Sequence, residues 1–201
     1  MTVYCYDTEF LDDGRTIELI SIGIVADDGR EYYAANSDMQ MERIKEPANA
    51  WLVRNVLPHL PIVGRAALER YLAHPQGQHP KPSISTVDLD RTSTLVKPKW
   101  VIANEVREFL LADGDDVELW AYYAAYDHVA LAQLWGPMMN LPKGIPMWTH
   151  DLMQLLEQLS DGFVMPEQVG DEHHALADAR WNRQVYDAAW SRVRGEPEMP
   201  F

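Results

Sequence analysis

The sequence is poor in cysteine, in basic side chains and in long apolar runs, and each shortage excludes something. Its one cysteine, Cys5, cannot form an internal disulfide, and a lone cysteine is typical of a protein from a reducing compartment. No apolar run approaches the length of a membrane span, and the N-terminus lacks a basic stretch followed by an apolar region. We therefore expect a soluble, cytoplasmic protein with no membrane partner.

Basic residues are outnumbered by acidic ones. Lysine and arginine together number 17 against 31 aspartates and glutamates, which gives a net charge of −14 at pH 7. This composition argues against nonspecific coating of nucleic acid, because such binding comes from basic side chains that neutralise phosphates. A metal-dependent enzyme escapes that argument, because bound Mg²⁺ or Mn²⁺ would supply the positive charge that a phosphate meets. With 201 residues, 47% of them hydrophobic, the chain is long enough for one domain with a full core.

The order of the secondary-structure patterns predicts a mixed α/β sheet with helices packed on it. Residues 2–36 predict three strands in antiparallel succession, with the turn sequence DDG between the second and the third. Residues 74–99 are rich in proline, serine and threonine, and they predict a loop-rich insertion outside the core, as a mobile arm or a dimer contact. The other patterns predict helices over 46–60, 65–72, 100–114, 149–159 and 175–194, a strand over 117–123 and a helix that opens near Asp127. Strands that form a meander and then alternate with helices are typical of the α/β class.

The stretch VYCYDTEFLDDG places two carboxylates at the end of a strand. Because side chains alternate along a strand, Asp7 and Glu9 share the face of the apolar Val3 and Cys5. Carboxylates in such surroundings are destabilising unless a cation or strong hydrogen-bond donors meet them. A divalent metal would meet this need. The alternative is an exposed strand end that runs into an acidic turn.

Two further acids stand at the start of apolar helix stripes. Asp127 begins the stripe of the helix that follows it, and Asp178 begins the stripe of the last helix. An acid in this position can also simply interact with the helix dipole. His173 precedes Asp178 by five residues, about 500° of helix, so the two cannot share a helix face. His173 must therefore lie in the loop before the helix and turn back towards it; the alternative is an exposed histidine near a helix start.

Together these residues predict a two-metal site for phosphoryl chemistry. Two divalent ions about 4 Å apart need several carboxylates, and the candidates are Asp7, Glu9, Asp127 and Asp178. Oxygen ligands favour Mg²⁺ or Mn²⁺ over zinc, and no pair of histidines has the helical spacing that zinc hydrolases use. A neutral His173 near the attacking water would serve as general base.

Three motifs in this order resemble the DEDDh group of 3'-to-5' exonucleases. DTEF carries Asp7 and Glu9, AYYAAYDHVAL carries Asp127, and HHALADAR carries His173 and Asp178 in an H-x-A-x-x-D pattern. Within this group, the sequence around the first two motifs closely resembles the polyadenylate-specific 3'-exoribonucleases of actinobacteria, the ribonuclease AS type.

The resemblance implies a fold and an activity. The implied fold is a ribonuclease-H-like mixed sheet, an antiparallel three-strand meander plus parallel strands flanked by helices, in one exonuclease domain over residues 1–201. The implied enzyme hydrolyses the 3' end of single-stranded RNA to nucleoside 5'-monophosphates, favours poly(A) and acts as a homodimer.

The resemblance also implies a role for each site residue. Asp7, Glu9 and Asp178 would hold the first of two Mg²⁺ or Mn²⁺ ions, and Asp7 would bridge to the second. Asp127 would join through water, and His173 would deprotonate the attacking water.

Substrate contacts are implied next to the first motif. The backbone at Thr8, Glu9 and Phe10 would seat the 3'-terminal nucleotide. Proofreading exonucleases of the DEDDh group typically carry D-x-E-T-T-G and an asparagine four residues before the acid of the second motif. Here the corresponding residues are Phe10, Leu11 and Tyr123, which argues against a proofreading enzyme.

Aromatic side chains offer stacking surfaces for single-stranded nucleic acid. Trp51, Trp135 and Trp181 lie within helical patterns, and we expect them in the core. Phe10 is the stronger candidate for a substrate contact because it directly follows the acids. Strand alternation puts it opposite Glu9, so this contact requires the strand to end or twist there.

Other functions remain open from the sequence. The same chemistry could act on short oligoribonucleotides or on DNA 3' ends. A noncatalytic RNA-binding module is the alternative from another class, and the complete set of acids and histidine argues against it.

Overall fold

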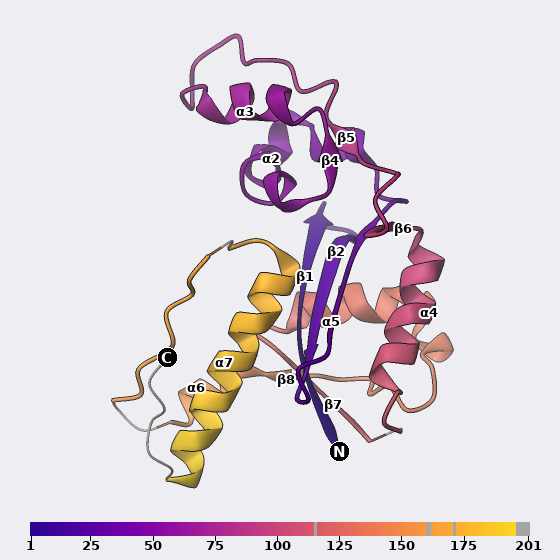
Figure 1. Cartoon of the computed structure of the whole chain (residues 1–201), viewed down its shortest axis with the longest axis vertical. Helices are drawn as coiled ribbons and strands as arrows, with labels where there is room; N and C mark the ends of the chain where they lie inside the picture. The colour runs from indigo at the N-terminus through magenta and orange to yellow at the C-terminus, as the bar shows by residue number, and fades with distance from the viewer. Residues whose placement is uncertain (115, 160–161, 171, 196–201) are drawn as a thin grey trace.

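A mixed sheet lies at the centre of the computed structural model, which describes residues 1–114, 116–159, 162–170 and 172–195. Within these residues the sheet has six strands in the order β6-β3-β2-β1-β7-β8 (Figure 1). The strands are β1 (Thr2–Asp12), β2 (Ile17–Ala26), β3 (Glu31–Asn36), β6 (Val96–Lys97), β7 (Val117–Ala121) and β8 (His150–Asp151). The pairs β1–β2 and β2–β3 are antiparallel, and the other neighbours are parallel. The predicted meander and the mixed α/β sheet are confirmed.

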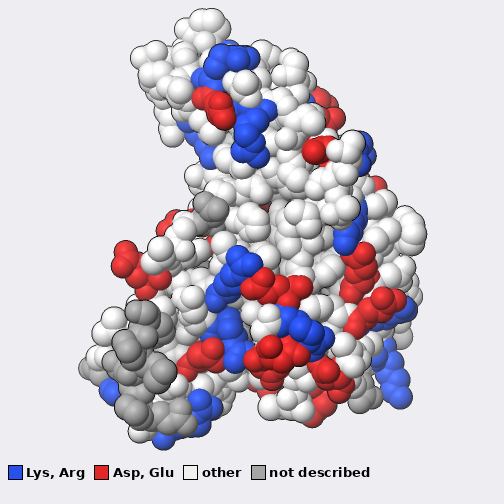
Figure 2. Space-filling view, in the orientation of Figure 1, with Lys and Arg blue, Asp and Glu red and all other residues white. Residues whose placement is uncertain are grey.

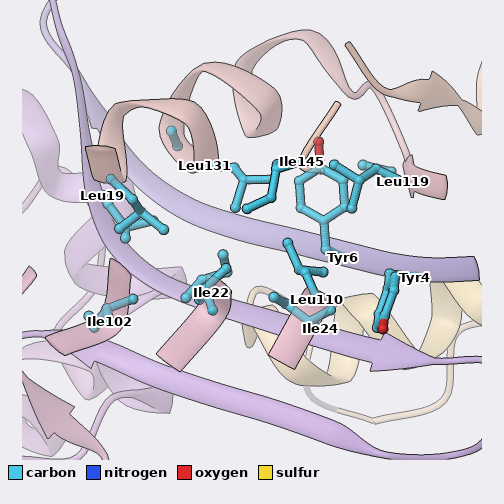
Figure 3. Packing of buried hydrophobic residues seen from close by; sticks show 14 of the residues in the cluster. Tyr4, Tyr6, Leu19, Ile22, Ile24, Ile102, Leu110, Leu119, Leu131 and Ile145 are labelled. Carbon is cyan, nitrogen blue, oxygen red and sulfur yellow. The ribbon is translucent and has the colours of Figure 1, made fainter. Parts of the chain in front are cut away.

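Helices cover both faces of this sheet, and β1 divides its side chains between them. Tyr4 and Tyr6 pack with α4 and α5 on one face, and Figure 3 shows this cluster. Val3 and Cys5 pack with α6 and α7 on the other face. The alternation predicted for β1 is therefore confirmed, and α7 has the predicted bounds. The four helices are α4 (Lys99–Leu110), α5 (Ala125–Ala132), α6 (Leu152–Glu157) and α7 (Ala175–Arg194), with 3-10 turns at Gln133–Trp135 and Met138–Asn140.

A third hydrophobic cluster fills a small lobe beyond the C-terminal end of β1 (Figure 1). We call residues 40–90 the lobe. A short two-stranded sheet, β4–β5, lies within it. Its elements are α1 (Met41–Ile44), α2 (Ala50–Asn55), β4 (Ile62–Val63), α3 (Arg65–Ala73) and β5 (Asp88–Leu89), with 3-10 turns at Pro47–Asn49 and Leu57–His59.

Two predicted helices are shorter than their sequence patterns. The pattern over 46–60 is divided into α2 between two 3-10 turns, and each turn contains a proline. The helix predicted over 149–159 begins only at Leu152, because Asp151 caps it. The Asp151 carboxylate accepts a hydrogen bond from the Met153 N–H at 2.9 Å.

Residues 74–99 are mostly irregular, but they do not lie wholly outside the core. Val87 and Leu89 are buried in the lobe cluster, and β6 pairs with β3. The expectation that this segment avoids the core is wrong at these residues, because its proline and serine content obscures two alternating apolar positions. The division of the chain into one domain with an insertion stays a prediction. Among the described residues, no helix is both long and apolar enough to cross a membrane.

Candidate active site

β1 extends beyond its parallel neighbour β7, and this leaves one edge of β1 open. The pairing of the two strands stops at Cys5. Further along, the Asn182 amide donates to the Tyr6 carbonyl at 2.9 Å, and the Thr8 N–H donates to Asp127 Oδ1 at 2.8 Å. Because buried backbone polar groups need partners, side chains of α7 and α5 replace the missing strand. Both helices are thereby anchored beside the DTEF motif.

The start of α7 lies directly on β2 at Gly23. A Cβ atom at Gly23 would lie 2.4 Å from backbone atoms of Ala175, so the close approach depends on glycine. His174 caps the helix, because its side chain accepts hydrogen bonds from two N–H groups of the first turn. Gly23 is also the sheet partner of Asp7. The first turn of α7 is therefore held beside the acidic part of β1.

Three of the predicted site residues come close enough to share one ion. One potential ligand atom from each of Glu9, His173 and Asp178 lies within 4.8 Å of the others. His173 lies in the loop before α7, with a positive φ of 66°, and it turns back towards Asp178 as the spacing predicted. Two carboxylates and an imidazole form a donor set that fits a divalent cation.

Asp7 and Asp127 interact electrostatically with this group. The pKa of Asp7 is raised first by burial and then by the negative charges of the other three acids. Burial, followed by the charges of Asp178 and Asp127, raises the pKa of Glu9 to about 8. Burial also raises the pKa of Asp127 to about 6, although hydrogen bonds from Thr8 oppose the shift. Asp7 and Asp127 therefore lie near enough to Glu9 and Asp178 to interact with them electrostatically, whereas the group within 4.8 Å consists of Glu9, His173 and Asp178.

In the described part of the chain, no lysine or arginine forms an ion pair with these carboxyl groups. Glu9 is 8% exposed and Asp127 is 6% exposed, so water can screen them only weakly. A divalent cation among the acids would favour their ionised forms and reduce their mutual repulsion.

Two polar contacts that the sequence did not reveal hold the acids in place. The N–H and the hydroxyl of Thr8 both donate to the same oxygen of Asp127, at 2.8 and 2.6 Å. Gln168, from the loop before α7, donates to Asp178. Thr8 therefore has no free donor for a nucleotide in this arrangement. The role predicted for the backbone at Thr8, Glu9 and Phe10 stays a prediction.

An aromatic pair borders the acids on the side of α5. The pairing register of β1 shifts between Glu9 and Phe10, which is the local irregularity that a substrate contact by Phe10 requires. The Phe10 ring stacks on Tyr126, with centroids 5.9 Å apart and planes at 16°. Tyr126 is 54% exposed, so this pair presents an aromatic surface next to the site.

Trp51 borders the site from the lobe, and the expectation that it belongs to the core is wrong. It is 55% exposed, and its ring meets the His173 ring edge to face. Trp135 and Trp181 do pack against the hydrophobic clusters, as predicted. The sequence offered one signal against burial of Trp51, because the polar Asn55 lies four residues further along the same helix face.

The fold is similar to that of a solved protein structure. The solved structure of Pop2p from S. pombe, in a form with Mg²⁺ and Mn²⁺ bound, is similar to this chain with a TM-score of 0.50 and 12% sequence identity. The likeness covers 96% of this chain and 84% of that one. It confirms the predicted fold class.

Sequence relatives define the enzyme class. Two proteins of Mycobacterium tuberculosis, 3'-5' exoribonuclease Rv2179c of strain H37Rv and 3'-5' exoribonuclease MT2234.1 of strain CDC 1551, are each 43% identical to this chain over 178 residues. The similarity covers 88% of this chain and 86% of each relative. Residues 76–190 match the family described as the 3'-5' exoribonuclease Rv2179c-like domain. The protein is a 3'-5' exoribonuclease, and it belongs to the Rv2179c-like family. The noncatalytic alternative is thereby set aside.

Proposed function

We propose that this exoribonuclease is a metal-dependent enzyme of the DEDDh type that releases nucleoside 5'-monophosphates from the 3' ends of single-stranded RNA. The observation that carries the proposal is the convergence of Glu9, His173 and Asp178 within 4.8 Å, beside the carboxylates of Asp7 and Asp127. Hydrolysis of a phosphodiester with two metal ions needs several carboxylates and a group that accepts a proton from water.

The acids would hold two Mg²⁺ or Mn²⁺ ions. Asp7, Glu9 and Asp178 would bind the first ion, Asp7 would bridge to the second, and Asp127 would join through water. When bound, the ions supply positive charge to the phosphate oxygens and activate the attacking water. The chain itself contributes rigid placement of the ligands. The two hydrogen bonds from Thr8, for example, fix one oxygen of Asp127.

His173 would act as the general base. A neutral imidazole can take the proton of the attacking water at one ring nitrogen. The backbone at His173 and its contact with the Trp51 ring restrict the orientation of the imidazole. Because His173 also lies close to Glu9 and Asp178, it could instead be a metal ligand. The His173→Ala variant described in the Discussion separates the two roles.

Single-stranded RNA fits the aromatic surfaces around the acids. Phe10 with Tyr126, and Trp51 from the lobe, offer faces on which unpaired bases can stack. The preference for poly(A) is supported by the resemblance of the first two motifs to the polyadenylate-specific enzymes. Short oligoribonucleotides and DNA 3' ends are the alternative substrates for the same chemistry.

The assembly and location of the protein are proposals of the same kind. We propose a homodimer, on the strength of the family resemblance, and a cytoplasmic location, which suits the single buried Cys5. Light scattering of the purified protein tests the assembly. A mass twice that of one chain would support the homodimer, and the mass of one chain would contradict it.

A panel of labelled substrates tests the proposed reaction. The protein is incubated with 5'-labelled oligomers of matched length, RNA or DNA, poly(A) or mixed sequence, with Mg²⁺, Mn²⁺ or a chelator. The proposal predicts a metal-dependent ladder that shortens from the 3' end, fastest on poly(A) RNA and absent with Asp7→Asn. Equal rates with chelator would exclude the metal mechanism, and equal rates on all RNA sequences would exclude the adenylate preference.

A further inference from the structure

One part of this acidic protein carries an excess of positive charge. Residues 47–87, which include α2 and α3, contain four basic residues and one acidic residue: Arg54, Arg65, Arg70, Lys81 and Glu69. The whole chain, by contrast, has a net charge of −14. Figure 2 shows basic side chains gathered on the lobe, above a hollow in the outline of the molecule. A region of positive charge can attract an anion that the rest of the protein repels.

A cavity of about 580 Å³ lies in the lobe between α2 and the segment that follows α3. We call it the lobe cavity. Among the described residues, no aspartate or glutamate lines it. Its lining includes the side chains of Trp51, Arg54, Asn55, Gln76 and Lys81. These supply hydrogen-bond donors, two positive charges and one large aromatic ring.

The two positively charged side chains of the lobe cavity, Arg54 and Lys81, are held in place without being neutralised. Arg54 donates to the carbonyls of Leu72 and His74, at 3.2 and 3.1 Å, and its guanidinium lies 5.2 Å from the centre of the Tyr71 ring. The Lys81 ammonium lies 5.8 Å from the same ring. Carbonyl groups and aromatic faces attract a cation but leave its net charge intact. Within the described residues, neither side chain forms an ion pair with a carboxylate.

Trp51 connects the lobe cavity with the active site. Its side chain lines the cavity, and its ring also meets the His173 ring with centroids 4.7 Å apart. An RNA chain whose 3' end lies at His173 can therefore continue past Trp51 into the lobe cavity. The phosphates of that chain would then move away from the acidic site and towards Arg54 and Lys81.

We propose that the lobe cavity binds the phosphodiester backbone of the RNA upstream of the bond that is cut, with Lys81 and Arg54 as the phosphate contacts. This inference rests on the proposed function, because it places the 3' end at His173. Its consequence is a preference for longer RNA. A decamer reaches the cavity, whereas a dinucleotide occupies only the active site.

The direct test is the salt dependence of RNA binding. Anisotropy of a fluorescent adenylate decamer is measured with the Asp7→Asn protein, and with the same protein carrying Lys81→Ala or Arg70→Ala. Arg70→Ala removes the same charge from the same lobe, at a residue that does not line the cavity. Each phosphate contact contributes about 0.7 to the slope of log affinity against log salt for single strands. Lys81→Ala should make that slope less steep by about 0.7, and Arg70→Ala should leave it unchanged. If the two proteins bind equally at 1 M salt, a difference of about 0.7 in slope makes binding by Lys81→Ala about eightfold weaker at about 50 mM salt.

A cleavage arm separates this inference from the proposed function. In the otherwise unchanged enzyme, Lys81→Ala should lower the ratio of kcat/KM for the decamer to kcat/KM for a dinucleotide, and Lys81→Arg should restore it. Equal losses of kcat/KM on both substrates would overturn the proposal that the lobe cavity binds the RNA backbone. A salt slope for Lys81→Ala equal to that for Arg70→Ala would overturn it as well. If the wild-type protein cuts neither RNA while the salt slope still falls with Lys81→Ala, the proposed reaction fails and the binding site stands.

Discussion

The indole ring of Trp51 meets the imidazole ring of His173 edge to face, with ring centroids 4.7 Å apart. Trp51 belongs to the lobe and His173 to the loop before α7, so this contact joins two distant parts of the chain. The contact restrains the imidazole of His173, the candidate base, and more than half of the Trp51 side chain stays exposed. Trp51 can therefore support the active site and stack on substrate at once.

Replacement of Trp51 by alanine should raise KM for RNA. Loss of a stacking aromatic costs about 1–3 kcal/mol per base, which corresponds to about 5-fold to 150-fold in affinity. Trp51→Phe should retain most of the wild-type value. Steady-state kinetics on an RNA decamer make the comparison, with Trp100→Ala as the control, because Trp100 is an exposed tryptophan on α4. An unchanged KM in Trp51→Ala would show that the ring does not contact substrate.

Replacement of His173 by alanine should slow the chemical step and spare the metal site. The usual effect of losing a general base is a decrease in kcat of about 10²-fold to 10⁴-fold. Single-turnover cleavage measures the rate, and calorimetric titration with Mn²⁺ measures metal affinity. A large loss of Mn²⁺ affinity would identify His173 as a ligand, as its distance from Glu9 and Asp178 permits.

The metal-free protein should lose stability as the pH rises from about 5 to about 8. The pKa values of Glu9, about 8, and Asp127, about 6, are raised by burial, so the folded state keeps protons that the unfolded state has already released. The contribution of Glu9 and Asp127 to stability is fully present below their pKa in the unfolded chain, about 4. It is lost as the pH rises through their pKa in the folded protein.

Thermal melts in chelator across this pH range measure the effect. Glu9→Gln cannot ionise, so its melting temperature should fall less with pH than that of the wild type. Added Mg²⁺ should stabilise the wild type most at the upper end of the range, where the acids are ionised. Parallel curves for wild type and Glu9→Gln would contradict the raised pKa of Glu9.

Replacement of Gly23 by alanine should move the start of α7. The added Cβ would lie 2.4 Å from the Ala175 backbone, and backbone atoms cannot rotate away as a side chain can. We expect a loss of about 1–3 kcal/mol or more in the free energy of unfolding, from overpacking. The cleavage rate should fall even under conditions where the variant stays folded, because His173 and Asp178 flank the displaced turn. Denaturant melts and cleavage rates check this, and wild-type values of both would refute the close approach.

Local patterns were sufficient to predict the parts of the site that belong to single elements. The alternation of β1 predicts that Asp7 and Glu9 share a face, and helix arithmetic predicts that His173 lies before α7. Each of these depends only on the geometry of one strand or one helix. The bounds of α7 could be predicted for the same reason, because apolar residues recur at helical spacing along it, and Ala175, Ala179, Val185 and Ala189 are buried.

Contacts between elements could not be predicted in this way. The helical pattern around Trp51 indicates a helix face, but only the packing of the lobe decides whether that face is covered. The two hydrogen bonds from Thr8 to Asp127 depend on where β7 ends beside β1. The close approach at Gly23 likewise depends on a helix more than a hundred residues away in the chain. Each of these belongs to tertiary structure, which no single motif encodes.

A crystal structure of the protein with Mn²⁺, measured at a wavelength where manganese scatters anomalously, tests whether the acids of β1, α5 and α7 form a metal site beside His173. We expect an anomalous peak within bonding distance of Glu9 and Asp178, adjacent to Asp7, and no such peak in Asp178→Asn. If saturating Mn²⁺ gave no peak at these carboxylates, the acids would not form a metal site.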